Sequence, residues 1–268
     1  MTQPILRTPD SHFDGLPGYD YAPHYVDDLP GYRGMRMHYI DARPARPAAA
    51  MQTYLCLHGE PTWCYLYRKM IPVFTAAGHR AVAPDWFGFG RSDKPSADAA
   101  YTFNFHRNAM LAFVERLDLT NVTLVVQDWG GLLGLTLPME APHRFKRLLV
   151  MNTTLAVGES PGPGFDAWRA YAAANPDLPI GALMKRSTPI LSDAEAAAYE
   201  TPSPDATYKA GPRRFPQLVM TSPEMEGVDV SRRAAEWWRT QWTGQAFMAI
   251  GEADPVLGPP VMEKLRLK

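Results

Sequence analysis

Asp128 is the residue of this chain whose position is best suited to chemistry. It follows an apolar, β-branched run over residues 121–127, which predicts a strand buried on both faces of a parallel sheet. Gly130 and Gly131 follow one residue later and open a helical pattern that extends to Pro138. A strand, a sharp polar tip and a glycine-opened helix form a nucleophile elbow, here with aspartate in the place of serine. A carboxylate at this point could equally cap the helix, so a reactive role and a capping role both stay open.

Alternating strands and helices flank this tip and must hold it in place. Apolar or alternating runs predict strands at residues 24–27, 36–41, 53–57, 80–85, 147–152 and 245–250, and apolar residues at helical spacing predict helices at 65–74, 105–117 and 232–242, with a short helix from Val261. The regular alternation between Thr53 and Asn152 predicts an open, mostly parallel α/β sheet flanked by helices.

The pattern changes after about residue 155. Residues 156–230 are rich in Pro, Gly and Ala and contain short helical pieces at 164–173, 179–186 and 193–199, without a convincing strand. A helical block between two sheet strands predicts a cap over the carboxyl edge of the sheet. The expected organisation is therefore an α/β core in residues 1–155, a helical cap in 156–230 and the second part of the core in 231–268.

Composition excludes several classes of function. The 268 residues carry 27 basic and 28 acidic side chains, so nothing attracts the chain to nucleic acid or to an anionic membrane. No apolar run is long enough to cross a bilayer, and residues 1–21 lack the order of a signal peptide. The two cysteines, Cys56 and Cys64, predict neither a disulfide nor a metal site. We expect a cytoplasmic monomer.

Four predicted strands end in polar residues that could form one site. His58-Gly59-Glu60, Asp85, Asp128 with Trp129, and Asp254 each follow a predicted strand. Ligands of open α/β sheets bind at the carboxyl ends of the strands. The sequence therefore predicts that these residues meet at one edge of the sheet.

Five segments together resemble one known family. They are His58-Gly-Glu-Pro-Thr-Trp63, Asp85-Trp-Phe-Gly-Phe-Gly-Arg-Ser-Asp93-Lys-Pro95, Val126-Gln-Asp-Trp-Gly-Gly131, Gly164-Phe-Asp-Ala-Trp168 and Phe247-Met-Ala-Ile-Gly251. This set resembles the haloalkane dehalogenases of the α/β-hydrolase fold, in the subfamily whose triad acid follows the late core strand. Many α/β hydrolases share the first two segments, whereas Asp followed by Trp at the elbow is much more specific. The resemblance implies an α/β-hydrolase core with a helical cap, acting on haloalkanes and water without a metal or organic cofactor.

The resemblance also implies a role for each site residue. Asp128 would be the nucleophile, because a carboxylate gives an ester that water can cleave, whereas serine would give an inert ether. The indole N–H groups of Trp129 and Trp168 would hold the leaving halide, although packing in the cap is an alternative for Trp168. The backbone N–H groups of Glu60 and Trp129 would bind the carboxylate and later the oxyanion. Asp254 would orient the general base, and the implied role of Phe165 is to line the pocket wall.

The histidine that the family uses as general base is not found at the expected place. None of the seven histidines follows Asp254, and in the family the base lies beyond one further strand. His58 belongs to the oxyanion-loop segment, where a structural role is expected. The sequence thus predicts alkylation with a stall at the ester, the C-terminal strand and helix of the fold missing from this chain, and an exposed sheet edge.

Two alternatives stay open beside the dehalogenase hypothesis. An epoxide hydrolase shares the fold and the aspartate nucleophile, and would need a cap tyrosine such as Tyr171, Tyr199 or Tyr208 to protonate the epoxide oxygen. A catalytically incomplete fragment or binding protein of the same fold is the second. A comparison of halide release with epoxide opening distinguishes a dehalogenase from an epoxide hydrolase. Quenching of tryptophan fluorescence by halide would show an intact pocket even in a protein without turnover.

Overall fold

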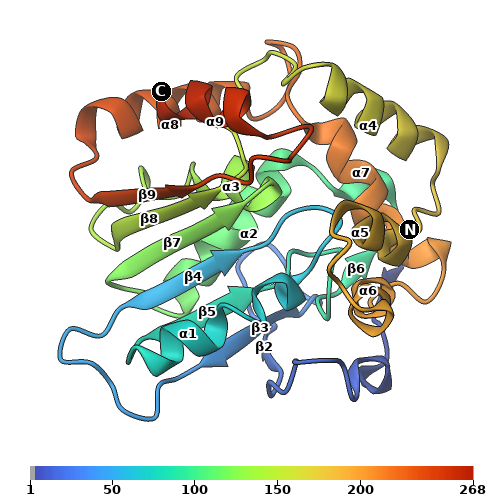
Figure 1. The fold of residues 1–268 in the computed structure, drawn as a ribbon, viewed down its shortest axis with the longest axis horizontal. Helices are drawn as coiled ribbons and strands as arrows, with labels where there is room; N and C mark the ends of the chain where they lie inside the picture. The colour runs from blue at the N-terminus through green and yellow to red at the C-terminus, as the bar shows by residue number, and fades with distance from the viewer. Residues whose placement is uncertain (1–3, 268) are drawn as a thin grey trace.

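The computed structural model describes residues 4–267, and its elements follow the predicted order closely (Figure 1). The strands are β1 Ile5–Leu6, β2 His24–Val26, β3 Met37–Ala42, β4 Thr53–Leu57, β5 Arg80–Pro84, β6 Lys94–Pro95, β7 Val122–Gln127, β8 Phe145–Met151 and β9 Gln245–Ala249. The α-helices are α1 Ile71–Ala76, α2 Phe103–Arg116, α3 Trp129–Gly134, α4 Pro163–Ala174, α5 Ile180–Ser187, α6 Asp193–Glu200, α7 Ala210–Leu218, α8 Val228–Gln241 and α9 Pro259–Arg266. Short 3-10 helices lie at η1 Asp10–Phe13, η2 Cys64–Tyr67, η3 Asp98–Ala100 and η4 Ala206–Lys209.

Seven strands form the central sheet in the order β2-β3-β5-β4-β7-β8-β9. The pairs from β5 through β4, β7 and β8 to β9 are parallel, whereas β3 is antiparallel to both β2 and β5. This confirms the mostly parallel open sheet expected from the sequence. It also brings the carboxyl ends of β4, β5, β7, β8 and β9 to the same edge.

The central strands are buried on both faces, as their continuous apolar runs predict. Along β4, Leu55 and Leu57 join a core cluster with α2 and α3, while Cys56 joins a second cluster with α1. Along β7, Leu124 and Val125 divide between the same two clusters. The sheet therefore separates two apolar cores, and helices cover each of its faces.

Two helices differ from their predicted bounds. The single helix expected over residues 65–74 is divided into η2 and α1, and Pro72 lies in the first turn of α1. Proline lacks the N–H that a helix interior requires, so a new helix begins beside it. The helix after Asp128 ends at Gly134 and does not extend to Pro138. The sequence did not predict α7, because Pro216 lies inside it.

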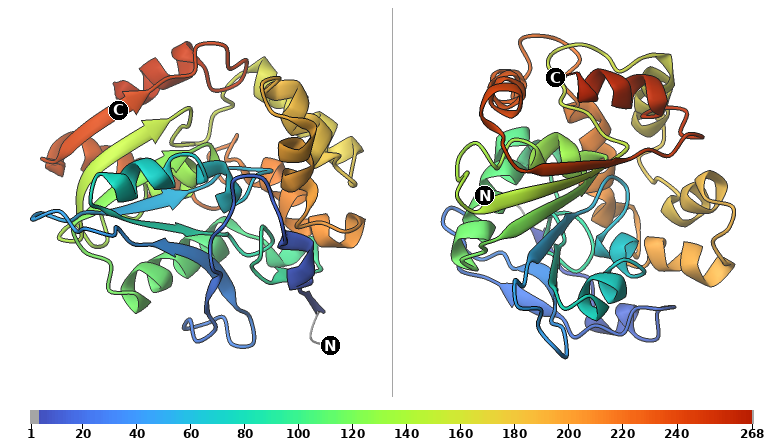
Figure 2. Two further views of the ribbon diagram at one scale, coloured as in Figure 1. Left: turned by 60° about the horizontal axis from the view of Figure 1, so that its bottom comes forward. Right: turned by 60° about the vertical axis from the view of Figure 1, so that its left-hand side comes forward.

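Helices α4 to α7 gather at the end of the sheet toward which the arrows of β4 and β7 point (Figure 1). Two further views show the same helices at this end of the sheet (Figure 2). Strand β9 is the last strand of the sheet on its side. No helix among residues 4–267 is long and apolar enough to cross a membrane.

Candidate active site

Asp128 lies at a sharp turn between β7 and α3. Its backbone has φ 50° and ψ −122°, a strained conformation for a residue with a side chain. Gly130 permits the turn, since a Cβ there would come within 1.8 Å of the carbonyl oxygen of Leu57. Asp128 occupies the N-cap position of α3, yet its side chain makes no capping hydrogen bond. The capping alternative is therefore wrong, and the carboxylate faces other partners.

Backbone N–H groups surround the Asp128 carboxylate. The N–H of Glu60 donates to Oδ1 at 2.7 Å, and the nearby N–H of Trp129 also lowers the pKa of the carboxyl group. Burial raises the pKa of Asp128 to about 6, against the lowering effect of these two donors and with a smaller raising effect from Asp254. The carboxylate is thus ionised at neutral pH but poorly solvated, which suits a nucleophile.

The loop that carries Glu60 is fitted closely to the nucleophile. A Cβ on Gly59 would lie 2.5 Å from the Cβ of Asp128, so only glycine allows this approach. The His58 ring is fully buried, with Nδ1 2.8 Å from the carbonyl oxygen of Gly59 and Nε2 accepting from the N–H of Trp86 at 3.2 Å. These partners assign the proton to Nδ1, and burial lowers the pKa of His58. His58 is therefore neutral and structural, as the sequence suggests.

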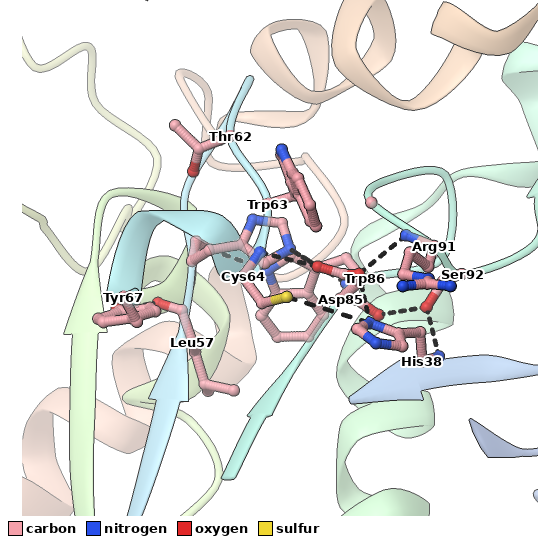
Figure 3. Close-up of polar contacts among 12 residues, drawn as sticks. His38, Leu57, Thr62, Trp63, Cys64, Tyr67, Asp85, Trp86, Arg91 and Ser92 are labelled. Carbon is pink, nitrogen blue, oxygen red and sulfur yellow. Dashed lines mark hydrogen bonds and ion pairs between the residues drawn. The ribbon is translucent and has the colours of Figure 1, made fainter. Parts of the chain in front are cut away.

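Asp85 braces the other end of this loop (Figure 3). Its carboxylate accepts hydrogen bonds from the N–H of Cys64 at 2.7 Å, from Nδ1 of His38 at 2.7 Å and from the N–H of Arg91 at 2.9 Å. The Ser92 hydroxyl accepts from the N–H of His38 and donates to the carbonyl oxygen of Asp85. Burial by itself would raise the pKa of Asp85, but His38 and the other donors hold it well below its usual range.

His38, Cys64 and Asp85 also lie close enough together to be considered as metal ligands. The contact between His38 and Asp85 is a direct hydrogen bond, and both side chains are fully buried. Cys64 has a second partner in the hydroxyl of Tyr19 at 3.3 Å. The three side chains are thus already satisfied by one another and by the surrounding loops. The cluster is best explained as a brace for the loop from His58 to Cys64.

Asp254 lies in the loop after β9 and is fixed by Asn152 at the end of β8. The Asn152 side chain donates from Nδ2 to Oδ2 of Asp254 at 2.9 Å and to the carbonyl oxygen of Gly251 at 3.0 Å, and accepts from the N–H of Gly251. The other oxygen of Asp254 accepts from the N–H groups of Val256 and Leu257. Asp254 is close enough to Asp128 to raise its pKa.

The two candidate halide-binding tryptophans come from different elements, Trp129 beside Asp128 and Trp168 beside Glu60. Trp129, at the start of α3, is 2% exposed and packs on Phe215 of α7 with ring centroids 4.4 Å apart. Trp168, on α4, lies close enough to the carboxyl group of Glu60 to oppose the rise of its pKa, and it stacks on Tyr171. Phe165 is buried in the same core cluster as Trp129. The structure therefore groups Trp129, Trp168 and Glu60 around Asp128.

No histidine of residues 4–267 hydrogen-bonds to Asp128 or to Asp254. His106 is fully buried on α2, with neither ring nitrogen bonded, and stacks on Tyr101 at an angle of 22°. Burial lowers the pKa of His106 to about 3, so its ring is neutral.

The sequence analysis did not identify three side chains of the site, those of Asn152, Phe215 and Glu60. Asn152 is the last residue of a predicted strand, and no local pattern distinguishes it from a turn residue. Phe215 belongs to α7, which was not predicted. The Glu60 side chain was overlooked because only its backbone N–H was considered. The signal that could have identified the Glu60 side chain is its position, since it is an acidic residue close to the end of a predicted strand.

Comparison with known proteins identifies similar chains. The family profile described as alpha/beta hydrolase fold matches residues 54–267. A haloalkane dehalogenase of Psychrobacter cryohalolentis is 46% identical over 97% of this chain and 86% of its own length. Haloalkane dehalogenase 1 of Mycobacterium tuberculosis is 48% identical over 95% of this chain and 84% of its own length. The solved tetrameric haloalkane dehalogenase DpaA of Paraglaciecola agarilytica is 49% identical with a TM-score of 0.94, covering 98% of this chain and 88% of that one.

Proposed function

This chain belongs to the haloalkane dehalogenases of the α/β-hydrolase fold, and on that basis we propose that Asp128 is its nucleophile. The enzyme hydrolyses a carbon–halogen bond of a haloalkane to an alcohol and a halide ion. One observation carries the assignment of the nucleophile. Asp128 lies at the strained tip of the elbow, and its carboxylate accepts a hydrogen bond from the N–H of Glu60 and makes no capping hydrogen bond to α3.

The first step is alkylation of Asp128. A carboxylate oxygen attacks the carbon that carries the halogen, the carbon–halogen bond breaks, and the halide leaves with the bonding electron pair. The indole N–H groups of Trp129 and Trp168 stabilise the negative charge that develops on the halide. Both side chains are large and apolar, so they provide these donors while excluding bulk water. Phe165 adds apolar wall beside them.

The second step is hydrolysis of the ester. Water adds to the ester carbonyl, and the N–H groups of Glu60 and Trp129 stabilise the oxyanion before the alcohol leaves and Asp128 is restored. In the family a histidine removes the proton from water, and an acid orients that histidine. We assign the orienting role to Asp254, which Asn152 holds in place. Within the 268 residues no histidine follows Asp254, so we expect this polypeptide by itself to accumulate the ester.

Intact mass spectrometry after incubation with excess 1-bromobutane tests the proposal, with free bromide measured in the same tube. We expect a butyl adduct that maps to Asp128 and about one bromide per chain. Asp128→Asn should show neither the adduct nor the released bromide. An adduct on another residue would refute the assignment of the nucleophile. Continued bromide release with unchanged mass would leave Asp128 in place but would contradict the expected stall.

The epoxide hydrolase alternative finds less support in the cap. The hydroxyl of Tyr199 accepts a hydrogen bond from Arg68, and the Tyr199 side chain is buried between core and cap. Tyr171 stacks on Trp168, with ring centroids 5.9 Å apart. We therefore keep halide release as the primary assay, with styrene oxide as the comparison substrate.

The assembly and the organisation of the chain are also proposals. The expectation of a monomer does not fit the tetrameric state of DpaA, a relative 49% identical to this chain. We infer that this protein self-associates, and light scattering coupled to size-exclusion chromatography should give a mass well above 29.9 kDa. We propose that residues 156–230, which contain α4 to α7, act as the cap between two core segments. Free, buried Cys56 and Cys64 fit a cytoplasmic setting.

A further inference from the structure

Thr153 is a buried polar residue beside the elbow that the mechanism above does not use. It lies just past the end of β8, and its side chain is fully enclosed by protein. Its hydroxyl donates a hydrogen bond to the backbone carbonyl oxygen of Asp128 at 2.6 Å. A buried hydroxyl needs a hydrogen-bond partner, and here the partner is the main chain of the proposed nucleophile.

The residues after β8 bind both backbone polar groups of Asp128. The N–H of Asp128 donates to the carbonyl oxygen of Asn152 at 3.0 Å, just past the paired ends of β7 and β8. The carbonyl oxygen of Asp128 accepts from the N–H groups of Gly131 at 2.9 Å and Leu132 at 3.1 Å, both in α3. The hydroxyl of Thr153 is a further donor to this oxygen, and it comes from outside the elbow.

Thr153 is itself held from two sides. A Cβ on Gly131 would lie 2.1 Å from Oγ1 of Thr153, so the side chain fits against α3 only because that position is glycine. The N–H of Thr153 donates to Sδ of Met262, a fully buried residue of α9, at 3.2 Å. The close contact with Gly131 and the bond to Met262 therefore fix the position of the hydroxyl.

The backbone of Asp128 requires such support. Its φ of 50° and ψ of −122° are strained for a residue with a side chain, and a strained conformation persists only where the surrounding structure holds it. A displacement of about 1 Å between reacting groups can lower a rate on the order of 100-fold. A small relaxation of the elbow would therefore turn the carboxylate away from the substrate carbon.

We propose that Thr153 is a positioning residue, whose hydroxyl holds the backbone of Asp128 in the conformation that directs the carboxylate at the carbon bearing the halogen. This inference rests on the proposed function, because it requires Asp128 to be the nucleophile. Thr153 needs no contact with the substrate, since it acts through the main chain of Asp128. The side chain of Asn152 holds Asp254, so residues 152 and 153 together fix the nucleophile relative to the proposed triad acid.

Single-turnover bromide release from saturating 1-bromobutane at pH 8, measured by rapid quench, tests the proposal. Thr153→Val keeps the shape of the side chain and removes the hydroxyl, so the alkylation rate should fall about tenfold. Thr153→Ser keeps the hydroxyl and should stay within about threefold of the wild type. Thr123→Val is the matched control, because Thr123 is also buried and its hydroxyl donates to Gln52 at 2.8 Å, but it lies at the other end of β7. Its alkylation rate should equal that of the wild type.

The pH profile of alkylation separates positioning from a change in the charge of the nucleophile. The N–H of Glu60 still binds the carboxylate in Thr153→Val, so the pKa of Asp128 should stay at about 6 while the plateau rate falls. A shifted midpoint with an unchanged plateau would overturn the proposal. So would a plateau rate in Thr153→Val equal to that of the wild type, or an equal loss in Thr123→Val.

The same comparison is possible if Thr153→Val does not fold. Thr153→Ser and Thr153→Ala differ only in the hydroxyl, so alkylation should be about tenfold slower in Thr153→Ala, and equal rates in these two variants would overturn the proposal. Failure of the proposed function looks different, because the wild type itself would then form no adduct at Asp128.

Discussion

Two acidic side chains, Asp128 and Glu60, lie next to each other in the site, and the protein holds one of them by backbone donors. The N–H groups of Glu60 and Trp129 compensate part of the cost of burying the Asp128 charge. The remaining cost keeps the pKa of Asp128 at about 6 and leaves the carboxylate weakly solvated. A weakly solvated anion is a better nucleophile than one surrounded by water. Burial of the Asp128 charge therefore makes the carboxylate more reactive and also makes the folded state less stable.

The pH dependence of alkylation should follow Asp128. Only the carboxylate attacks, so the single-turnover rate of bromide release should be constant above about pH 7 and fall tenfold per unit below the pKa of about 6. Asp254→Asn removes a charge that raises this pKa, so the midpoint should move to lower pH. Rapid-quench bromide assays provide the measurement. A profile that is flat down to pH 4.5 would contradict a buried carboxylate nucleophile.

Removing the Asp128 charge should stabilise the fold. A carboxyl group whose pKa is raised in the folded state destabilises that state once it ionises, so the penalty develops between about pH 4 and pH 6 and is complete above it. Asp128→Asn should therefore gain about 1–3 kcal/mol of unfolding free energy at pH 8 and almost nothing at pH 4. Urea denaturation at both pH values measures the difference. Asp14→Asn, an exposed control, should show no such pH-dependent gain.

At the scale of elements, the site is assembled from loops that follow several strands and is covered by helices that the core holds in place. The loop after β4 carries Glu60, the elbow after β7 carries Asp128, and the loop after β9 carries Asp254. Helix α6 is attached to the core in part through Arg68, which donates to Glu195 at 2.7 Å and to the hydroxyl of Tyr199 at 3.3 Å. The position of α6 thus depends in part on a buried guanidinium.

Arg68→Met should loosen α6 without disturbing the sheet. The Arg68 side chain is almost fully buried, and removing it leaves Glu195 and Tyr199 without that donor, at a cost of about 1–3 kcal/mol. Hydrogen exchange should accelerate in α5 and α6 while β4 and β7 keep their protection. Lys69→Met is the matched control, because Lys69 pairs with the same Glu195 at 2.9 Å but is 70% exposed. Its effect should stay within about 0.5 kcal/mol, and an equal loss in both variants would argue against a buried attachment.

At the scale of the whole molecule, the two ends of the sheet differ in character. On one side the sheet ends in the antiparallel strands β3 and β2, while on the other β9 is the edge strand. Strand β9 is uncharged, and Phe247 on it is 65% exposed. Uncharged, apolar edge strands invite pairing with other chains.

Placing a charge on β9 should reduce aggregation. Phe247→Lys adds a charge to the exposed edge while removing little buried surface, so light scattering during heating should begin at a higher temperature with a nearly unchanged melting temperature. Val73→Lys is the control, because Val73 is 64% exposed but lies on helix α1. If both variants suppress aggregation equally, added net charge explains the effect and the edge does not.

Much of the fold and of the site could be predicted from local sequence. The apolar runs at β4, β5 and β7 predict strands buried on both faces, because only such strands tolerate continuous apolar residues. The elbow around Asp128 needs glycine beside a polar tip, and that requirement is visible in the sequence. The bounds of η2, α1 and α7 could not be predicted in the same way, because prolines at 72 and 216 disturb the helical pattern locally.

The sequence by itself determined which residues could react and that their strands end at one edge, since residue type and hydrophobic period are local properties. Only the tertiary structure decided which partners each of them meets. The bonds from Asn152 to Asp254 and from His38 to Asp85, and the contact of Trp168 with Glu60, join residues far apart along the chain. The tertiary structure also decided between a capping and a reactive Asp128, because the carboxylate binds the N–H of Glu60, 68 positions away in the sequence. Such contacts depend on how whole elements pack, and no local pattern records that packing.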